Sequence, residues 1–557
     1  MVWPFQEAQG EEGLACRADS QCPVDQACLI NQCQLPPLYL FLFTHTEDHI
    51  NHTLSEERFQ RLLPTVTDLS RDYPDLTPSW TLAFMGADAE TLAERHPETG
   101  LLKVLQGEDA SQGGVLHFGY HGAHEPTYTN NALTSLEGDQ ADWERTVQGA
   151  LAYLTLGKDP LLGGVDPSRT GGVKKVEEVW GEIQVVSGLA LDQALVFTLD
   201  RLLGDFVMFG FPDHGPLSNP DYGAALKRLI SRLTPEHRTP AGLFWMNGHL
   251  RINDGNPLDG VGALNLIESS ETLAGELALL DPARLQVINA HLASKYLYAK
   301  ESPTDYAYDH PEAPELTEAD LWSEEAREGR YQTTAANLKY LAAEMLSGMD
   351  GSRFVSPRDL VDLFVDESGE EIPLERVERV ARALLQTVDG ALPDFVVARG
   401  YYYSLAECWS LLVQALATYD KLGELPDGVL LKPVYGPLAS TPAISQSRLV
   451  AMSDLLQAAQ GESLKLEAGS GFPMPQNIIP AQVTLPGGNI NAAEYLQAVA
   501  RVLVRISEWS PESESGLGGM VRVAPLAGVA GIHELLVAVQ EPRYPGTSWT
   551  LKPARHR

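Results

Sequence analysis

Basic residues are scarce in this chain, and their scarcity excludes one class of partner. The 557 residues include 40 Lys and Arg against 75 Asp and Glu, so the formal net charge is −35. Nucleic acids and anionic membrane surfaces are bound through clustered Lys and Arg, because an acidic surface repels their phosphates. We therefore expect no nucleic-acid partner. A neutral or weakly cationic partner is easier to accommodate, although an acidic surface can also serve solubility alone.

Long apolar runs and several familiar motifs are also missing. No stretch of about 18 apolar residues occurs, so we expect no transmembrane segment. The opening residues MVWPFQEAQGEEG have neither a basic start nor an apolar core, and so do not form a signal peptide. Glycine motifs of the Walker A and Rossmann kinds do not occur. With 44% hydrophobic residues, the composition is that of a globular protein, and the length suggests two to four domains.

Cysteine is rare, and its distribution is uneven. Four of the five cysteines, Cys16, Cys22, Cys28 and Cys33, lie in one block with the spacing C-x5-C-x5-C-x4-C. Zinc sites usually contain C-x2-4-C pairs, and here the last pair alone falls within that range. The spacing favours two disulfides in an oxidising compartment, with reduced thiols in a cytosolic protein as the alternative. We expect Cys408, in an apolar helical pattern, to be a buried thiol.

The cysteine block resembles the small four-cysteine modules near the N-termini of exported bacterial proteins. The resemblance rests on the stretch CRADSQCPVDQACLINQC, residues 16–33. It implies a periplasmic, cell-surface or extracellular protein from which a signal or lipoprotein leader has been removed. We therefore expect residues 1–36 to form a disulfide-rich leader.

Residues 37–349 alternate between strand-like and helical patterns. Seven apolar runs predict strands: LYLFLFTH, SWTLAFMG, GVLHFGYH, IQVVSGLA, DFVMFGF, GLFWMNGHL and LQVINAHL. Near-continuous apolar runs separated by amphipathic stretches are typical of a parallel sheet that is covered by helices. We therefore predict an α/β fold, a seven-stranded and mainly parallel β/α barrel over residues 37–349. In such barrels the chemistry lies at the carboxyl ends of the strands.

Residues 350–557 show a different pattern, in which helical units recur. The stretch Ile372–Val396 is followed by the similar stretch Tyr403–Val429, and their Leu-Pro-Asp triplets are 33 residues apart. A third start, Ile490–Trp509, aligns with the second, and the segment near Val355 is a degenerate candidate. Units this small bury their apolar faces only against neighbours, so we predict a helical repeat domain. The pattern weakly resembles pseudomurein-binding-type repeats, which implies wall or glycan binding; a plain helical packing domain is the alternative.

The chemistry-bearing residues follow three of the predicted strands. The first strand leads into FTHTEDHINH, which contains Glu47 and Asp48. The third ends in HFGYHGAHEP, with His121 and His124, and the last ends in VINAHLASKY, with His291. Because parallel strands end at one edge of a sheet, these residues are expected to converge there.

An aspartate with two histidines makes a set that holds a divalent transition metal, zinc above all, and leaves positions open for water and substrate. We assign Asp48, His121 and His124 as metal ligands. A metal-bound water is acidic and can attack a carbonyl. Glu47 would act as the base, and His291 would protonate the leaving group.

Simpler roles exist for some of these residues. Asp48 precedes a helical pattern and could act in capping, with Ser55 and Arg58 nearby. A lone histidine on an apolar strand is usually structural, which we expect for His117 and His249.

The three landmarks resemble polysaccharide deacetylases with the NodB-type β/α barrel. That family has an acidic pair after strand one, a two-histidine element ending in Pro, and a late histidine on the last strand. The resemblance covers about residues 38–300 and implies that Glu47 is the base, Asp48, His121 and His124 hold the metal, and His291 is the general acid. The chain departs from the family pattern in three respects: the acidic pair is Glu-Asp rather than Asp-Asp, two residues rather than three separate the histidines, and Glu125 precedes Pro126.

The leading hypothesis is an exported, metal-dependent carbohydrate deacetylase-like hydrolase that acts on an acetylated amino-sugar polymer. Its C-terminal repeats would hold it to a glycan or cell-envelope polymer. One alternative is a glycoside hydrolase on a similar barrel, which needs two carboxylates, here Glu47 or Glu125 with Asp213. Another is a non-catalytic glycan-binding protein of the cell surface.

Overall fold

A computed structural model represents the whole chain of 557 residues. The residues that it describes are 27–29, 32–34, 37–45, 52–84, 86, 89, 92–93, 101–110, 113–121, 172–189, 207–210, 237–238, 244–247, 261–267, 271, 273, 286–293, 295–300, 318–348, 350–363, 367, 369–393, 395–432, 434, 437, 441–468, 477–509, 519–528, 549 and 552–553.

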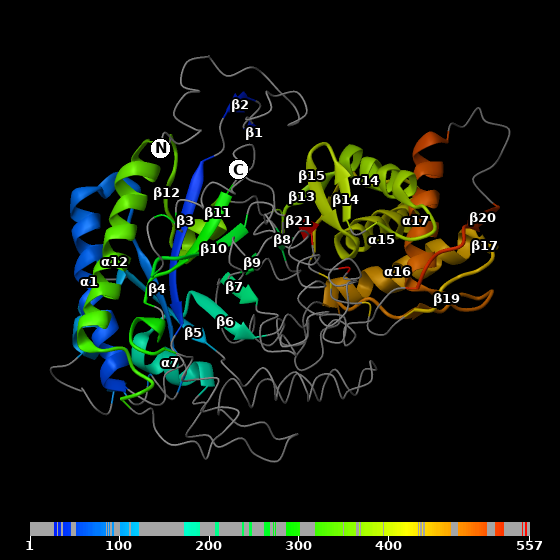
Figure 1. Ribbon diagram of the computed structural model, residues 1–557. Coiled ribbons are helices and arrows are strands. Elements are labelled where there is room, and N and C mark those ends of the chain that lie inside the picture. The colour runs from blue at the N-terminus through cyan, green and yellow to red at the C-terminus, as the bar shows by residue number, and fades with distance from the viewer. Residues whose placement is uncertain are drawn as a thin grey trace, which may run out of the picture.

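A large sheet organises the N-terminal part of the molecule (Figure 1). Eight of its strands run parallel: β3 (Leu38–His45), β4 (Trp80–Phe84), β5 (Leu116–His121), β6 (Val185–Leu189), β7 (Val207–Gly210), β9 (Phe244–Asn247), β10 (Val261–Asn265) and β11 (Gln286–His291). Their spatial order is β10-β11-β3-β4-β5-β6-β7-β9. The last of them along the chain, β11, thus lies beside the first, β3.

Three short strands extend this sheet to eleven strands: β8 (His237–Arg238), β12 (Arg353–Phe354) and β21 (Lys552–Pro553). β12 pairs in parallel with the start of β3. β8 pairs antiparallel with β9, and β21 pairs antiparallel with β8. The sheet therefore gathers segments from the two ends of the chain.

All seven predicted strands are present in an α/β arrangement with a parallel sheet, but the predicted seven-stranded barrel is not shown. The structure adds β10 as an eighth parallel strand. The sequence pattern missed it because Val-Gly-Ala-Leu-Asn is short and includes Gly, Ala and Asn, which have low strand propensity. Within the described residues, β9 and β10 are not paired with each other.

Helices cover the sheet. α1 (His52–Asp72) and α12 (Glu324–Tyr340) contact each other and lie side by side at the edge of the molecule in Figure 1. Arg61 of α1 forms an ion pair with Glu328 of α12. The further helical elements here are η2 (Pro74–Leu76), α3 (Leu101–Gly107), α7 (Gly172–Trp180), η4 (Lys295–Leu297), η5 (Leu341–Met345), η6 (Leu346–Gly348) and α13 (Pro357–Asp362).

Strand alternation divides the residues of β3 between two faces. Leu38, Leu40 and Leu42 belong to a buried cluster with apolar residues of α1 and α12. Phe41 and Phe43 are equally buried but lie outside that cluster, and their rings stack with centroids 5.8 Å apart. Both faces of the sheet are therefore apolar at this strand, which explains the near-continuous apolar run in the sequence.

A second buried cluster lies in the C-terminal part, to the right in Figure 1. Its elements are β13 (Glu371–Pro373), α14 (Leu374–Thr387), β14 (Phe395–Ala398), β15 (Tyr401–Ser404), α15 (Leu405–Leu422), β16 (Gly428–Leu430), β17 (Arg448–Ala451), α16 (Met452–Ala468), β18 (Gln482–Val483), β19 (Ile490–Asn491), α17 (Ala492–Glu508) and β20 (Met520–Val523). Trp549 packs into this cluster, and its carbonyl accepts a hydrogen bond from the amide of Ala406.

The same order of strand pairing occurs twice in this part. The inner pair β14–β15 and the outer pair β13–β16 frame α14 and α15. The inner pair β18–β19 and the outer pair β17–β20 frame α16 and α17 in the same way. α14, α15 and α17 occupy the three predicted helical stretches. The segment near Val355 instead follows β12, and α16 is a helix that the repeat pattern missed.

The change from the first buried cluster to the second falls later in the chain than the expected domain boundary after residue 349. Phe354 still belongs to the first cluster, because β12 pairs with β3, and Ile372 belongs to the second. The boundary itself stays a prediction. No helix within the described ranges is long and apolar enough to cross a membrane.

The cysteine block is described in part. Its strands β1 (Ala27–Leu29) and β2 (Gln32–Gln34) form an antiparallel hairpin in which Cys28 stands opposite Cys33. Cys16 and Cys22 lie outside the described residues, and the disulfides stay a prediction. Cys408 is fully buried in α15, as expected.

Candidate functional site

Three parallel strands end on a histidine. His45 is the last residue of β3, His121 the last of β5 and His291 the last of β11. Since parallel strands point the same way, all three residues lie at the carboxyl edge of the sheet. β3 and β11 are adjacent, and β4 alone separates β3 from β5.

The strand register determines how far each of these histidines lies along the strand direction relative to the others. His291 is the register partner of Phe43, two residues before His45, and the amide of Leu292 donates to the carbonyl of Phe43 over 3.3 Å. On the other side of β3, His45 pairs with Ala83. Residues that are almost 250 positions apart in the chain are thereby brought to one place on the sheet.

His121 is fully buried at the end of β5, where it pairs in register with Ser187 of β6. The two strands approach closely because Gly119 lies two residues earlier on β5. A Cβ atom at Gly119 would lie 2.7 Å from the carbonyl oxygen of Val185, so glycine is required at this spacing. His121 is thus held by a strand with little room to move.

Several predicted site residues lie outside the described residues: Glu47, Asp48, His124, Glu125 and Asp213. For His291 the structure gives the backbone position, at the end of β11. Among the described residues no group of three or more His, Cys, Asp or Glu side chains is arranged to hold a metal. The predicted ligand set, two of whose three members are outside that part, stays a prediction.

A buried polar network that no sequence pattern indicates lies close to this edge of the sheet. Thr44 Oγ1 accepts hydrogen bonds from Trp80 Nε1 over 3.0 Å and from the amide of Ala293 over 3.1 Å. Arg58 Nη1 donates to the carbonyl of Ala293 over 2.9 Å. Thr44, Trp80 and Ala293 are completely buried, and Arg58 is 1% exposed.

Arg58 is buried and contacts the Ala293 carbonyl, in contrast to the capping contact that the sequence suggests for it. Its guanidinium lies 4.9 Å from the ring centre of Phe59 and 6.0 Å from that of Tyr298. In the sequence, the burial of Arg58 is indicated only by its place in a helical pattern beside the apolar residues Phe59 and Leu62.

His117 has the structural role that was expected of it. Its Nδ1 lies 2.8 Å from the amide oxygen of Gln184 on the segment before β6. Burial lowers the pKa of His117, while Gln184 and the carboxylates of Asp359 and Asp109 oppose that shift. His117 is therefore harder to protonate in the folded protein than in the unfolded chain, and it links β5 to the segment before β6. His249 lies outside the described residues.

Comparison with known proteins defines no family for this chain. No family model and no curated protein matches it. Among solved structures, the crystal structure of 4-alpha-glucanotransferase from Thermococcus litoralis is similar at 12% identity, with a TM-score of 0.32. The match covers 63% of this chain and 46% of the glucanotransferase chain. A likeness of that size carries no argument about activity.

Proposed function

We propose that the protein is a metal-dependent, carbohydrate deacetylase-like hydrolase that acts on an acetylated amino-sugar polymer. The parallel pairing of β11 with β3 is the observation that carries this proposal. It brings His291 to the edge of the sheet from which the chain continues, two residues past His45, into Glu47 and Asp48.

The strand order supports the barrel that this function needs. The eight parallel strands follow one another in chain order around the sheet, with the last beside the first. This is the order of a β/α barrel that is interrupted between β9 and β10. We infer a closed β/α barrel whose carboxyl end carries the site.

Of the three predicted metal ligands, His121 alone lies within the described residues, and its setting supports the proposal. His121 is an imidazole at 0% exposure at the carboxyl end of a parallel strand, which is the setting of a histidine ligand whose orientation is fixed. Asp48, His121 and His124 would hold a divalent transition metal, zinc by our expectation. When bound, such an ion supplies an acidic water and polarises a carbonyl.

The remaining steps belong to the side chains of this chain. Glu47 would take the proton from the water that attacks the acetyl carbon. His291, from the neighbouring strand β11, would give a proton to the departing amine nitrogen as the bond from carbon to nitrogen breaks. Water and the acetamido group thereby yield acetate and a free amine, and the protons balance.

Metal content and acetate release test this proposal. We expect about one zinc ion per wild-type chain by elemental analysis, and its loss in the H121A/H124A double variant. Acetate should be released from acetylated chito-oligosaccharides by the wild type and not by the double variant. The control is H117Q, on the same strand, which should keep metal and activity.

Each failure has a distinct meaning. A wild type that takes up no metal from zinc-supplemented buffer contradicts the deacetylase mechanism. Cleavage of glycosidic bonds without acetate release would favour the glycoside hydrolase alternative, with Glu47 or Glu125 and Asp213 as its carboxylates. Glycan binding without either reaction would favour the non-catalytic alternative.

We propose that the protein is exported and that its C-terminal part docks on a glycan or cell-envelope polymer. This part is built from four strand–helix–strand units. The residue before each helix N-cap is buried in all four units: Ile372, Tyr403, Val450 and Ile490. The fourth helical residue is buried as well: Val377, Cys408, Leu455 and Tyr495. The recurrence of this pattern with the same strand pairing supports a repeat.

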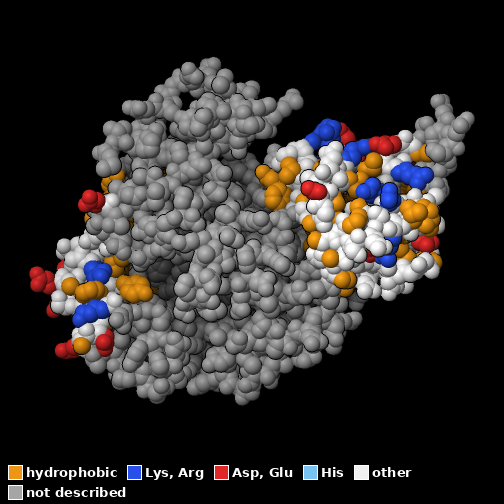
Figure 2. All heavy atoms as spheres, turned by 45° about the vertical axis from the view of Figure 1, so that its right-hand side comes forward, with side chains coloured by type: hydrophobic (Ala, Val, Ile, Leu, Met, Phe, Trp, Pro, Cys, Tyr) orange, Lys and Arg blue, Asp and Glu red, His pale blue; other side chains and the backbone are white. Residues whose placement is uncertain are grey.

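The surface of this part also supports docking. Figure 2 shows hydrophobic and basic side chains interspersed on it. Four exposed aliphatic residues lie on its two-stranded sheets: Val397, Leu430, Leu449 and Met520. Leu449 and Met520 lie on the paired strands β17 and β20, and exposed apolar side chains that are grouped in this way often serve a partner.

Co-sedimentation of the full chain with insoluble glycan tests this second proposal. We expect the L449S/M520S variant to sediment several-fold less than the wild type. L422S is the matched control, because Leu422 is equally exposed, at 62% against 61% for Leu449, but lies at the end of α15. Equal sedimentation of all three proteins would contradict a role for this face.

A further inference from the structure

The chain leaves the sheet after Leu292, whose amide still donates to Phe43 of β3, and the backbone of the next residue, Ala293, is held by side chains. β11 ends at His291, and η4 begins at Lys295. Between them, the amide of Ala293 donates to Thr44 Oγ1 and the carbonyl of Ala293 accepts from Arg58. Both backbone polar groups of the buried residue Ala293 are thus satisfied by side chains, one from β3 and one from α1.

Thr44 connects this segment to two strands at once. Its hydroxyl oxygen also accepts from Trp80 Nε1, so one atom joins β3, β4 and the end of β11. The hydrogen bond to Ala293 spans 249 positions of sequence. Thr44 directly precedes His45 and lies three residues before Glu47, so its anchor belongs to the segment that carries the predicted base.

Arg58 contributes a charged contact at the same place. A buried guanidinium is costly unless its position is fixed by hydrogen bonds and packing. Arg58 meets this condition through the Ala293 carbonyl and through the rings of Phe59 and Tyr298. A lysine there keeps the positive charge but loses the planar fork that can contact a carbonyl and two rings together.

We propose that Thr44 and Arg58 are positioning residues, which clamp Ala293 and thereby fix His291 relative to the carboxyl end of β3. The proposal rests on the proposed function for its catalytic consequence. The hydrogen bonds to the Ala293 backbone can be measured without any substrate. Neither residue contacts substrate in this role; each acts on catalysis through the position of His291.

Hydrogen exchange followed by mass spectrometry tests the clamp in the full-length protein. T44V removes the acceptor of the Ala293 amide with little change of shape, and R58K weakens the contact to its carbonyl. We expect peptides that span residues 286–298 to exchange about fivefold faster in T44V, as for the loss of one hydrogen bond. R58K should produce a smaller increase, and R58M a larger one.

T81V is the matched control. Thr81 lies on β4, one residue from Trp80, is 1% exposed, and its hydroxyl has no hydrogen-bond partner within the described part of the structure. The substitution is the same, in the same sheet, without a clamp to break. Exchange over residues 286–298 should therefore match the wild type.

Kinetics supply the readout that distinguishes positioning from simple stability. On acetylated chito-oligosaccharide, T44V and R58K should lower kcat about tenfold and leave KM within about twofold of the wild type. The folded fraction, checked by circular dichroism at the assay temperature, should be unchanged. T81V should keep the wild-type kcat.

Each outcome decides a separate question. Unchanged exchange over residues 286–298 in T44V overturns the clamp, as does faster exchange spread evenly over the whole sheet. Faster local exchange with an unchanged kcat overturns the positioning role. If the wild type releases no acetate, the proposed function fails, and the exchange experiment still decides whether Thr44 and Arg58 hold the end of β11.

Discussion

Gly119 determines how closely β5 and β6 approach beside the candidate site. A Cβ atom at this position would lie 2.1 Å from a methyl carbon of Val185 and 2.7 Å from its carbonyl oxygen. The side chain could rotate away, but the backbone oxygen could not. The absence of a side chain at residue 119 is therefore a structural requirement two residues before His121.

We expect G119A to destabilise the protein by about 1–3 kcal/mol, the usual cost of overpacking. The measurement is urea unfolding followed by circular dichroism. G107A is the control, because Gly107 is exposed near the end of α3 and its added Cβ meets nothing within 4 Å. Its stability should change by less than about 0.5 kcal/mol. Equal effects of the two substitutions would contradict the close approach of β5 and β6.

His117 should make the stability of the first cluster depend on pH. Its folded-state pKa is lowered, with burial as the largest cause. Above the unfolded pKa of about 6.5 the side chain is neutral in both states and contributes no pH dependence. As the pH falls through that value, the unfolded chain takes up a proton and the folded protein does not, so stability falls until the folded pKa is reached.

We therefore expect the wild type to lose more stability than H117Q between about pH 8 and pH 5, a window that includes the unfolded pKa. Glutamine keeps a polar partner for Gln184 but cannot take up the proton. The two free energies of unfolding, measured by urea titration at several pH values, should diverge on the acid side. Parallel curves for the two proteins would rule out this role of His117.

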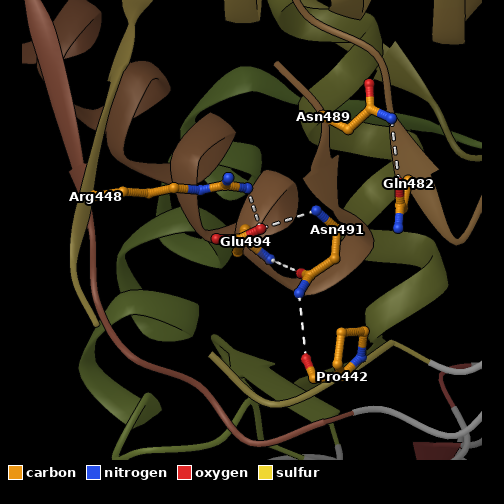
Figure 3. A network of polar contacts seen from close by, with 6 residues as sticks. All are labelled: Pro442, Arg448, Gln482, Asn489, Asn491 and Glu494. Carbon is orange, nitrogen blue, oxygen red and sulfur yellow. Dashed lines mark hydrogen bonds and ion pairs between the residues drawn. The ribbon is translucent and has the colours of Figure 1, made fainter. Parts of the chain in front are cut away.

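At the scale of elements, two helices of the C-terminal part, α15 and α17, begin with matching caps. In α15, Ser404 and Glu407 form a capping box, and in α17 Asn491 and Glu494 do the same. Figure 3 shows that Asn491 also donates to the carbonyl of Pro442 and that Arg448 of β17 forms an ion pair with Glu494. These caps fix where each strand turns into its helix.

We expect N491A to cost about 1–2 kcal/mol and S404A about 1 kcal/mol, since a lost cap leaves helical amides without an acceptor. Asn491 should cost more because its contact with Pro442 is lost too. S453A, at an exposed position in the first turn of α16, should change stability by less than about 0.5 kcal/mol. Thermal unfolding of the three variants measures these differences, and a silent N491A would contradict the importance of the cap.

The sequence predicted elements best where their pattern was strong. Seven near-continuous apolar runs became parallel strands, because a strand buried on both faces must be apolar throughout. The short strand β10, with its small residues, and the helix α16, with Ala, Ser and Gln among its apolar residues, gave weaker patterns and were missed. The local pattern therefore predicts long buried segments well and short or partly polar elements poorly.

The candidate site was predictable to the extent that it follows strand ends. His121 and His291 each close an apolar run, and the structure places both at the carboxyl edge of the sheet. The clamp on Ala293 was not predictable, since it depends on the register of β11 against β3 and on which side chains lie beneath that pair.

At the scale of the whole molecule, charge is distributed unevenly. Residues 1–370 hold 57 of the 75 acidic residues and 25 of the 40 basic ones. Residue 370 is close to the point where the first buried cluster gives way to the second, between Phe354 and Ile372. The acidity of the protein therefore belongs almost entirely to the part that contains the large sheet, and the C-terminal part is close to neutral.

This asymmetry predicts that salt stabilises the two parts differently. Like charges repel one another in a compact, strongly acidic body, and that repulsion is screened within about 10 Å at 0.1 M salt. The part with the large sheet should therefore unfold at a higher temperature as salt is added. The C-terminal part, whose charges nearly balance, should unfold at almost the same temperature throughout.

Differential scanning calorimetry between about 0.01 M and 1 M sodium chloride, where the screening length falls from about 30 Å to 3 Å, measures this difference. Two transitions are expected because two separate cores are present. N491A identifies the transition of the C-terminal part, since it should lower that one alone, and G119A identifies the other. If both transitions rise equally with salt, specific ion effects outweigh repulsion and the charge argument fails. If the G119A-sensitive transition alone rises, the acidity of the first part limits its stability, and a cationic polymer that neutralises it should stabilise the same transition.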